Sequence, residues 1–109
     1  MSERMHLPNR RGAVAISFTH RDQRFRAHIG YFAGGGLAEI FLDAARPDSA
    51  LDAFAADAAI LISLLLQRGS SPAEIGHALR RTPDGLPASL IGAAIDQLQA
   101  ILHDDEEHQ

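Results

Sequence analysis

The chain has no cysteine, no lysine and no tryptophan among its 109 residues. Without cysteine it carries no disulfide, thiolate metal site or iron–sulfur cluster, and no thiol of its own performs redox chemistry. It also lacks a long apolar run, because the longest nearly apolar segment, residues 58–66, is far shorter than the roughly 20 residues that span a bilayer. The first residues do not have the pattern of a signal peptide. We therefore expect a soluble cytoplasmic domain that does not bind membranes.

Charge is distributed unevenly along the chain. All 10 basic residues are arginine, and six of them lie in residues 1–30, whereas residues 31–109 hold four arginines and twelve acids. The formal net charge of −4 gives no strong field, so we do not expect binding to nucleic acid. At this length we expect one domain. It comprises an extended basic arm at residues 1–12, a folded part at 13–103 and a disordered acidic tail at 104–109.

Three segments have the alternation that is typical of half-buried strands. Apolar residues occupy every second position in residues 13–19, 25–31 and 37–42. Short turns separate these segments, the second of them rich in glycine. Such a pattern predicts an antiparallel three-stranded meander, and because helical patterns follow it, we expect an α+β fold.

Three helices are predicted after the strands. The first covers about residues 49–68, the second about residues 72–81 and the third about residues 90–103. The start of the second is marked most clearly, because Ser71 precedes a proline and has a glutamate three residues on. The third has one inward apolar stripe of ordinary width.

The first predicted helix is apolar around nearly its whole circumference. One stripe contains Leu51, Phe54, Ala58, Ile62 and Leu65. A second stripe contains Ala53, Ile60 and Leu64, and a narrow, weakly polar arc contains Asp52, Ala56, Ser63 and Gln67. A helix of this kind is normally buried on two sides. We expect one side to cover the sheet and the other to meet either the remaining helices or a second subunit. The pattern thus favours a homodimer, with Ile60 and Leu64 as interface candidates.

Several short runs occur in the order and spacing of a known domain. They are GGGLAEIFL at residues 34–42, AADAAI at 55–60, LLLQRG at 64–69, ALRR at 78–81, PDGLP at 83–87 and IGAAID at 91–96. Together they resemble the TSCPD domain over about residues 7–102. That domain occurs in the C-terminal part of adenosylcobalamin-dependent (class II) ribonucleotide reductases and as small free-standing proteins, which are the more similar group.

The resemblance implies an accessory or interaction module associated with a ribonucleotide reductase chain as a partner. It does not imply catalysis here, because the Thr-Ser-Cys-Pro-Asp signature is absent and nucleotide reduction needs sulfur that the chain lacks. We expect no cofactor, since the barrel that holds cobalamin in the large enzymes is several hundred residues long. We expect no catalytic residue either.

Few side chains are candidates for chemistry. The histidines have no metal-ligand spacing, so we expect no metal site. Asp57 lies among apolar residues of the first helix, where a buried carboxylate needs a partner, and it is explained either by a bridge to an arginine or by acid–base chemistry. An alternative function is a small regulator that binds a nucleotide or another anion. Its candidate ligands are Arg10, Arg11, Arg80, Arg81 and Asp84.

Overall fold

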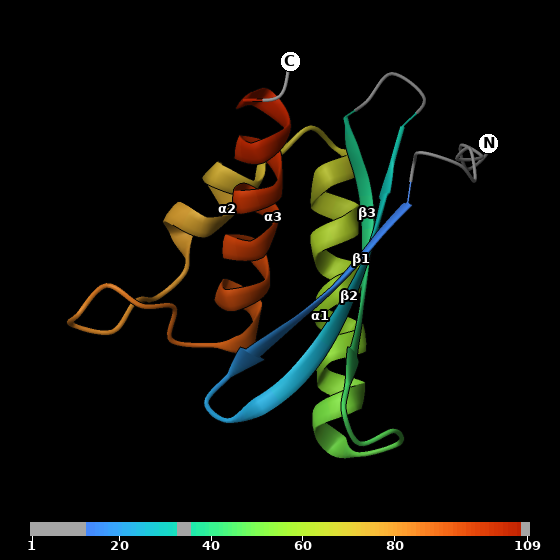
Figure 1. The fold of residues 1–109 in the computed structure, drawn as a ribbon, viewed down its shortest axis with the longest axis vertical. Coiled ribbons are helices and arrows are strands. Elements are labelled where there is room, and N and C mark those ends of the chain that lie inside the picture. Colours follow the sequence, from blue (N-terminus) through green and yellow to red (C-terminus); the bar gives the residue numbers. More distant parts are fainter. Residues whose placement is uncertain (1–12, 33–35, 108–109) are drawn as a thin grey trace.

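The computed structural model describes residues 13–32 and 36–107, and it has the predicted α+β order of three strands followed by three helices (Figure 1). The strands are β1 (Ala13–His20), β2 (Gln23–Tyr31) and β3 (Leu37–Ala44). The helices are α1 (Ala50–Gln67), α2 (Pro72–Ala78) and α3 (Leu90–Glu107). The predicted basic arm at residues 1–12 lies outside the described residues.

The strands form an antiparallel sheet in the order β1-β2-β3. Arg21 and Asp22 join β1 to β2, and both have positive φ (51° and 66°), which is the backbone of a two-residue type I′ hairpin turn. This turn fixes the register, in which Phe18 lies opposite Phe25 and the two rings stack with centroids 5.5 Å apart. One face of the sheet is consequently apolar and the other carries polar side chains.

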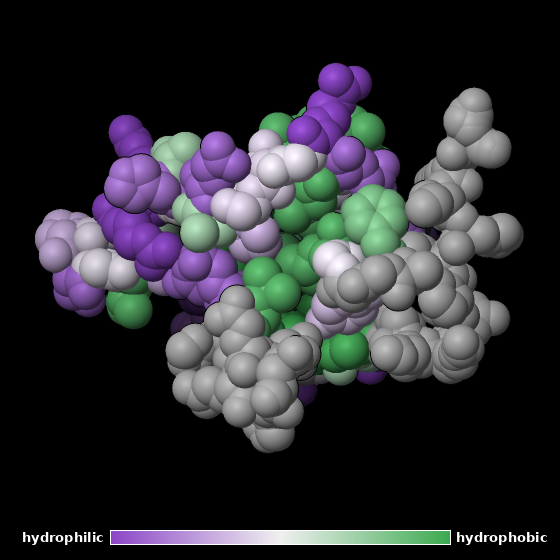
Figure 2. Space-filling model, turned by 90° about the horizontal axis from the view of Figure 1, so that it is seen from above, coloured by the Kyte–Doolittle hydropathy of each residue, from purple (hydrophilic) through white to green (hydrophobic). Residues whose placement is uncertain are grey.

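The core lies between the apolar face of the sheet and the helices, all on one side of the sheet (Figure 1). Its buried strand residues are the alternate ones of the predicted pattern: Phe18, Phe25, Ala27, Ile29, Ala38, Ile40 and Leu42. From the helices it takes mainly α1 alanines and the inward stripe of α3. Seen from above, hydrophobic residues gather across the middle of the molecule, and hydrophilic residues gather on the side of α2 (Figure 2).

Helix α1 begins and ends where the sequence predicts. The Ser49 hydroxyl caps its N-terminus by accepting a hydrogen bond from the Asp52 N–H (3.0 Å), and Gly69 follows its last turn with φ +101°. The helix packs chiefly against β3. Its buried residues are mostly small, namely Ala55, Ala58 and Ala59 together with Ile62 and Leu66. Small side chains let the helix axis approach the sheet closely.

The polar arc of α1 has a role that hydropathy did not predict, because it lies along the open edge of β3. The Ser63 hydroxyl accepts a hydrogen bond from the Ile40 N–H (2.9 Å) and donates one to the Ile40 carbonyl (3.0 Å). The Asp52 carboxylate accepts from the Ala44 N–H (2.9 Å), and the Gln67 amide donates to the Ala38 carbonyl (2.9 Å). These side chains satisfy backbone groups that an edge strand otherwise leaves free for pairing with another chain.

Of the two alternatives for the second side of α1, cover by the remaining helices is wrong, and cover by a second subunit stays a prediction. Only the side that faces the sheet and the core is buried, and neither α2 nor α3 covers the opposite side. Phe54 and Leu65, which share a stripe with Ala58 and Ile62 in the sequence pattern, are exposed. The reason is that the side with the alanines and the polar arc fits against β3 better than a side with large apolar residues.

Helices α2 and α3 pack on each other and complete the core. Ser71 and Glu74 form the predicted capping box at the start of α2, which ends at Ala78 rather than near Arg81. Helix α3 continues to Glu107, so residues 104–107 of the predicted disordered tail are helical, and residues 108–109 lie outside the described residues. Gly76 allows a close approach of the two helices, because a Cβ there would lie 3.0 Å from Ile95 Cγ2.

Candidate functional site

The most unusual surface of the molecule is the side of α1 that faces away from the sheet, which we call the outer face of α1. It consists of seven residues spaced three or four apart: Phe54, Asp57, Ile60, Leu61, Leu64, Leu65 and Arg68. The five large apolar side chains, in chain order, are 53%, 55%, 62%, 49% and 42% exposed. Of the seven large hydrophobic residues that are exposed among the described residues, five are therefore on one face of one helix.

This distribution is the reverse of that expected for a surface helix of a monomeric protein. Such a helix places its large apolar side chains inward and its polar ones outward, whereas α1 buries three alanines and exposes three leucines. Full burial of a large apolar side chain stabilises by roughly 1.5–3 kcal/mol. Five side chains left about half exposed therefore leave about 4–7 kcal/mol of burial unrealised. A contiguous patch of this kind marks an interaction surface.

Sequence analysis found part of this face and missed part of it. Ile60 and Leu64, the predicted interface candidates, both belong to it. Leu61 was not assigned to either stripe, and Phe54 and Leu65 were placed in the other stripe, with Ala58 and Ile62. The signal that could have found them is the alanine content of the opposite side, since alanines at positions 55, 58 and 59 indicate close packing.

The outer face of α1 carries two charges, and one of them corrects a prediction. Asp57 is exposed rather than buried, so its carboxylate needs no bridge to an arginine within the chain. The reason is that the second apolar stripe around Asp57 faces solvent instead of a packed helix. Arg68 is exposed beyond the end of α1. No ion pair found in the described part of the chain includes either residue.

Arg81 and Asp84, two of the predicted anion ligands, have partners within the chain. Arg81 makes a bidentate ion pair with Asp96 of α3 (2.7 and 3.1 Å) and also donates to the Gly85 carbonyl (3.1 Å). The hydrogen bonds that the Arg81 guanidinium donates to the Asp96 carboxylate raise the pKa of Arg81 above its usual value. The carboxylate of Asp84 accepts a hydrogen bond from the Thr82 hydroxyl. The Arg81–Asp96 pair holds the segment between α2 and α3 onto α3.

The other predicted anion ligands are Arg80, Arg10 and Arg11. Arg80 is exposed, and in the described residues it takes part in no ion pair. Arg10 and Arg11 lie outside the described residues. Binding of a nucleotide or another anion therefore stays a prediction.

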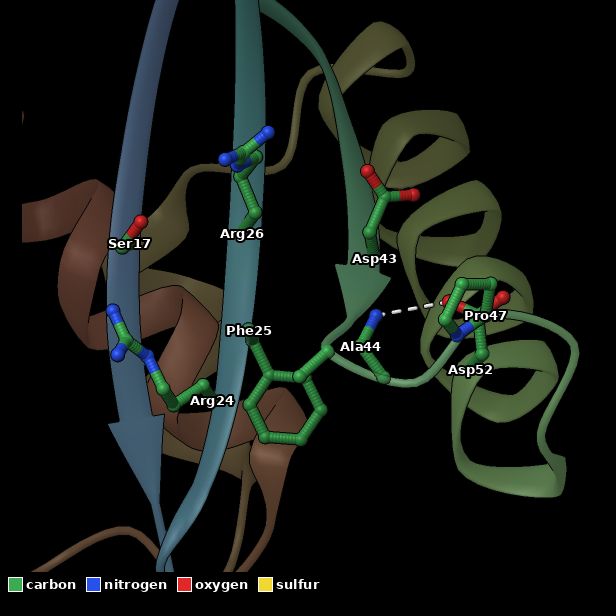
Figure 3. A pocket seen from close by; sticks show the side chains of 9 residues that line it. Ser17, Arg24, Phe25, Arg26, Asp43, Ala44, Pro47 and Asp52 are labelled. Carbon is green, nitrogen blue, oxygen red and sulfur yellow. Dashed lines mark hydrogen bonds between the residues drawn. The ribbon is translucent and has the colours of Figure 1, made fainter.

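The polar face of the sheet holds a shallow groove that sequence analysis did not single out. It has a volume of about 660 Å³ and is lined by Arg24, Arg26, Ser17 and Asp43 from the three strands and by Asp52 of α1 (Figure 3). Its two arginines come from β2 and its two acids from β3 and α1 (Figure 3), and the Asp43 carboxylate lies 3.4 Å from His28 Nε2. The Asp52 carboxylate is already bonded to the Ala44 N–H. The groove therefore offers mixed charge without a concentrated field for one ligand.

A second groove, of about 520 Å³, lies where the β1–β2 turn approaches α3. His20 lines it, and the His20 Nε2 atom is buried without a hydrogen-bond partner. The groove also contains Asp84 and Asp96, which are engaged with Thr82 and Arg81. Within residues 13–32 and 36–107, no three His, Asp or Glu side chains are grouped so that they could hold a metal ion.

Comparisons with known proteins do not name a function for these surfaces. No family model, curated protein or solved structure matches the chain. The resemblance to the TSCPD domain therefore stays a prediction.

Helix α1 also has the length and composition of a membrane-spanning segment, with a mean hydropathy of 1.7 over its 18 residues. A core helix of a soluble protein has the same properties. Here α1 belongs to the compact fold, because its inner side is buried against the sheet and three of its polar side chains bond the backbone of β3.

Proposed function

We propose that this chain is a non-catalytic interaction module that self-associates through the outer face of α1. The observation that carries the proposal is the exposure of Phe54, Ile60, Leu61, Leu64 and Leu65 on a helix that buries alanines. An accessory role of this kind agrees with the resemblance to the TSCPD domain.

The magnitude of the unrealised burial supports the proposal. The free energy of burial that these side chains leave unrealised, about 4–7 kcal/mol, is comparable with the net stability of a whole domain, about 5–15 kcal/mol. Association loses translational and rotational freedom, which offsets part of the gain. When two copies bring the same face together, however, each copy buries its own patch. A dimer at micromolar concentration corresponds to about 8 kcal/mol, which is within reach of two such patches.

The polar groups that the structure describes support a non-catalytic role. Asp52 and Ser63 are bonded to the backbone of β3, and Arg81, Asp84 and Asp96 stabilise the segment between α2 and α3. Each of these groups has a structural partner. Covalent catalysis requires a nucleophile with an adjacent base; where a described hydroxyl does donate to a carboxylate, from Thr82 to Asp84, the same hydroxyl also bonds the Leu86 backbone and so has a structural role.

Sedimentation velocity of the full chain tests the proposal. We expect the wild-type protein to sediment as a dimer at tens of micromolar. The double variant Leu61→Ser/Leu64→Ser should sediment as a folded monomer, because it removes apolar surface that the single chain already exposes. Leu86→Ser is the matched control, since Leu86 is 60% exposed but lies away from α1, and it should dimerise normally.

Two results would contradict the proposal. One is a wild-type protein that stays monomeric throughout the concentration range. The other is a dimer that Leu61→Ser/Leu64→Ser leaves intact while circular dichroism shows native helix content.

The resemblance adds a class II ribonucleotide reductase chain as a second proposed partner. Mixing the two purified proteins and measuring whether they sediment together tests this partner.

A further inference from the structure

The outer face of α1 has an ordered arrangement of charge that specifies how a second copy would meet it. Asp57 lies one turn after Phe54, which begins this face, and Arg68 lies at the opposite end; the residues between the two charges are Ile60, Leu61, Leu64 and Leu65. The two charges are eleven residues apart, which is about 16 Å along a helix. An acid and a base at opposite ends of an apolar stripe are complementary to the same stripe turned around.

We infer that two copies pair their α1 helices antiparallel, with Asp57 of each copy facing the partner's Arg68. This inference rests on the proposed self-association and adds its geometry. A two-fold axis that passes α1 midway between Ile62 and Ser63 places Asp57 opposite Arg68 at both ends. The same axis places Ile60 opposite Leu65 and Leu61 opposite Leu64. All six outer-face positions from 57 to 68 are thus paired by one operation, as an isologous interface requires.

The alternative orientation leaves the charges badly placed. Parallel helices would bring Asp57 against Asp57 and Arg68 against Arg68, and like charges at an interface are unfavourable. Neither residue has an ion-pair partner among the described residues of its own chain. The antiparallel arrangement gives both of them one.

A membrane surface is a poorer occupant of this face than a second copy. Helices that bind the membrane interface carry many lysines and arginines beside their apolar face, whereas α1 contains no basic residue at all and is followed by a single one, Arg68. Asp57 would also enter the apolar layer without a cation to pair with it. In an antiparallel dimer the same aspartate lies beside an arginine.

Charge reversal tests the orientation on the full-length protein by sedimentation equilibrium. Asp57→Arg and Arg68→Asp should each raise the dimer dissociation constant at least tenfold, because each replaces two attractive contacts by two repulsive ones. The double variant Asp57→Arg/Arg68→Asp should return to within about threefold of wild type. An equimolar mixture of the two single variants should form a heterodimer of near wild-type affinity, since every pair is again opposite in sign. Arg80→Asp, an exposed arginine away from α1, is the control and should change little.

The outcomes separate the orientation from the proposed function. Single variants that dimerise as tightly as wild type, while Leu61→Ser/Leu64→Ser is monomeric, would overturn the antiparallel pairing and leave the interaction module standing. A wild-type protein that is monomeric in solution would overturn both. Flotation with vesicles of phosphatidylcholine and phosphatidylserine covers the remaining occupant. If the protein does not dimerise but binds the vesicles, and Leu61→Ser/Leu64→Ser abolishes that binding, the face is assigned to a membrane and the inference is overturned.

Discussion

Replacing Ser63 by alanine tests whether α1 holds the edge of β3. The hydroxyl makes two hydrogen bonds to Ile40, as acceptor at 2.9 Å and as donor at 3.0 Å. Each such bond stabilises by about 0.5–1.5 kcal/mol, so Ser63→Ala removes about 1–3 kcal/mol. Alanine is a better helix former than serine by a few tenths of a kcal/mol, which offsets a small part. We expect a net loss of about 1–2 kcal/mol, because Ser63 is only part-buried and water reaches some of the freed groups.

Urea unfolding at one fixed protein concentration measures this loss, since dimerisation makes stability depend on concentration. A loss of this size corresponds to a fall in Tm of several degrees for a domain of about 100 residues. Ser63→Thr keeps the hydroxyl and is the control, which should lose less than half as much. A Ser63→Ala protein that is as stable as wild type, or more stable, would show that helix propensity outweighs the contacts to β3 and refute the edge-capping argument.

Three further predictions concern the rest of the fold. Gly76→Ala should lower stability by about 1–2 kcal/mol in a thermal melt, because its Cβ would lie 2.9 Å from Gln99 Nε2 and 3.0 Å from Ile95 Cγ2; an unchanged melt would mean that α2 and α3 are not packed this closely. Arg81→Ala and Asp96→Ala, combined in a double-mutant cycle, should show a favourable coupling for this partly exposed bidentate pair; additive effects would contradict the role of this pair. Nucleoside phosphates at millimolar concentration should not raise Tm, since the charge of Arg81 is already paired, and a clear rise would favour the anion-binding function instead.

The sequence predicts those parts of the fold that depend on local patterns. The alternation of apolar residues predicts the three strands. The cap at Ser49 and the capping box at Ser71 predict the starts of two helices. These signals are local, because a strand's alternation and a helix's first turn depend on residues a few positions apart. The limits of α2 and α3 are less well predicted, since helix ends depend on packing and on the segment that follows.

The orientation of α1 could not be predicted from hydropathy. A hydropathy pattern ranks Phe54 and Leu65 as core residues and Ala55 and Ala59 as neutral ones, but close packing against a strand favours the small side chains. The pattern also records Ser63 only as weakly polar. Its role depends on free backbone groups of Ile40, which every edge strand has and no side-chain pattern reveals.

The candidate site was predicted in part for the same reason. An all-round apolar helix does indicate a second contact beyond the sheet, and Ile60 and Leu64 belong to the exposed face. The pattern does not say whether that contact lies within the chain. It also does not say that Asp57 is exposed, because the exposure of a carboxylate depends on which side of the helix the rest of the fold covers.

Accessibility of the outer face in solution is the most direct test of the central claim, and a chain without cysteine makes the measurement clean. Leu64→Cys and Leu86→Cys each introduce one thiol, at exposed positions of the single chain. At high protein concentration we expect a maleimide to label position 64 at least tenfold more slowly than position 86, with the protection lost on dilution. Equal labelling rates at both positions at every concentration would contradict the account.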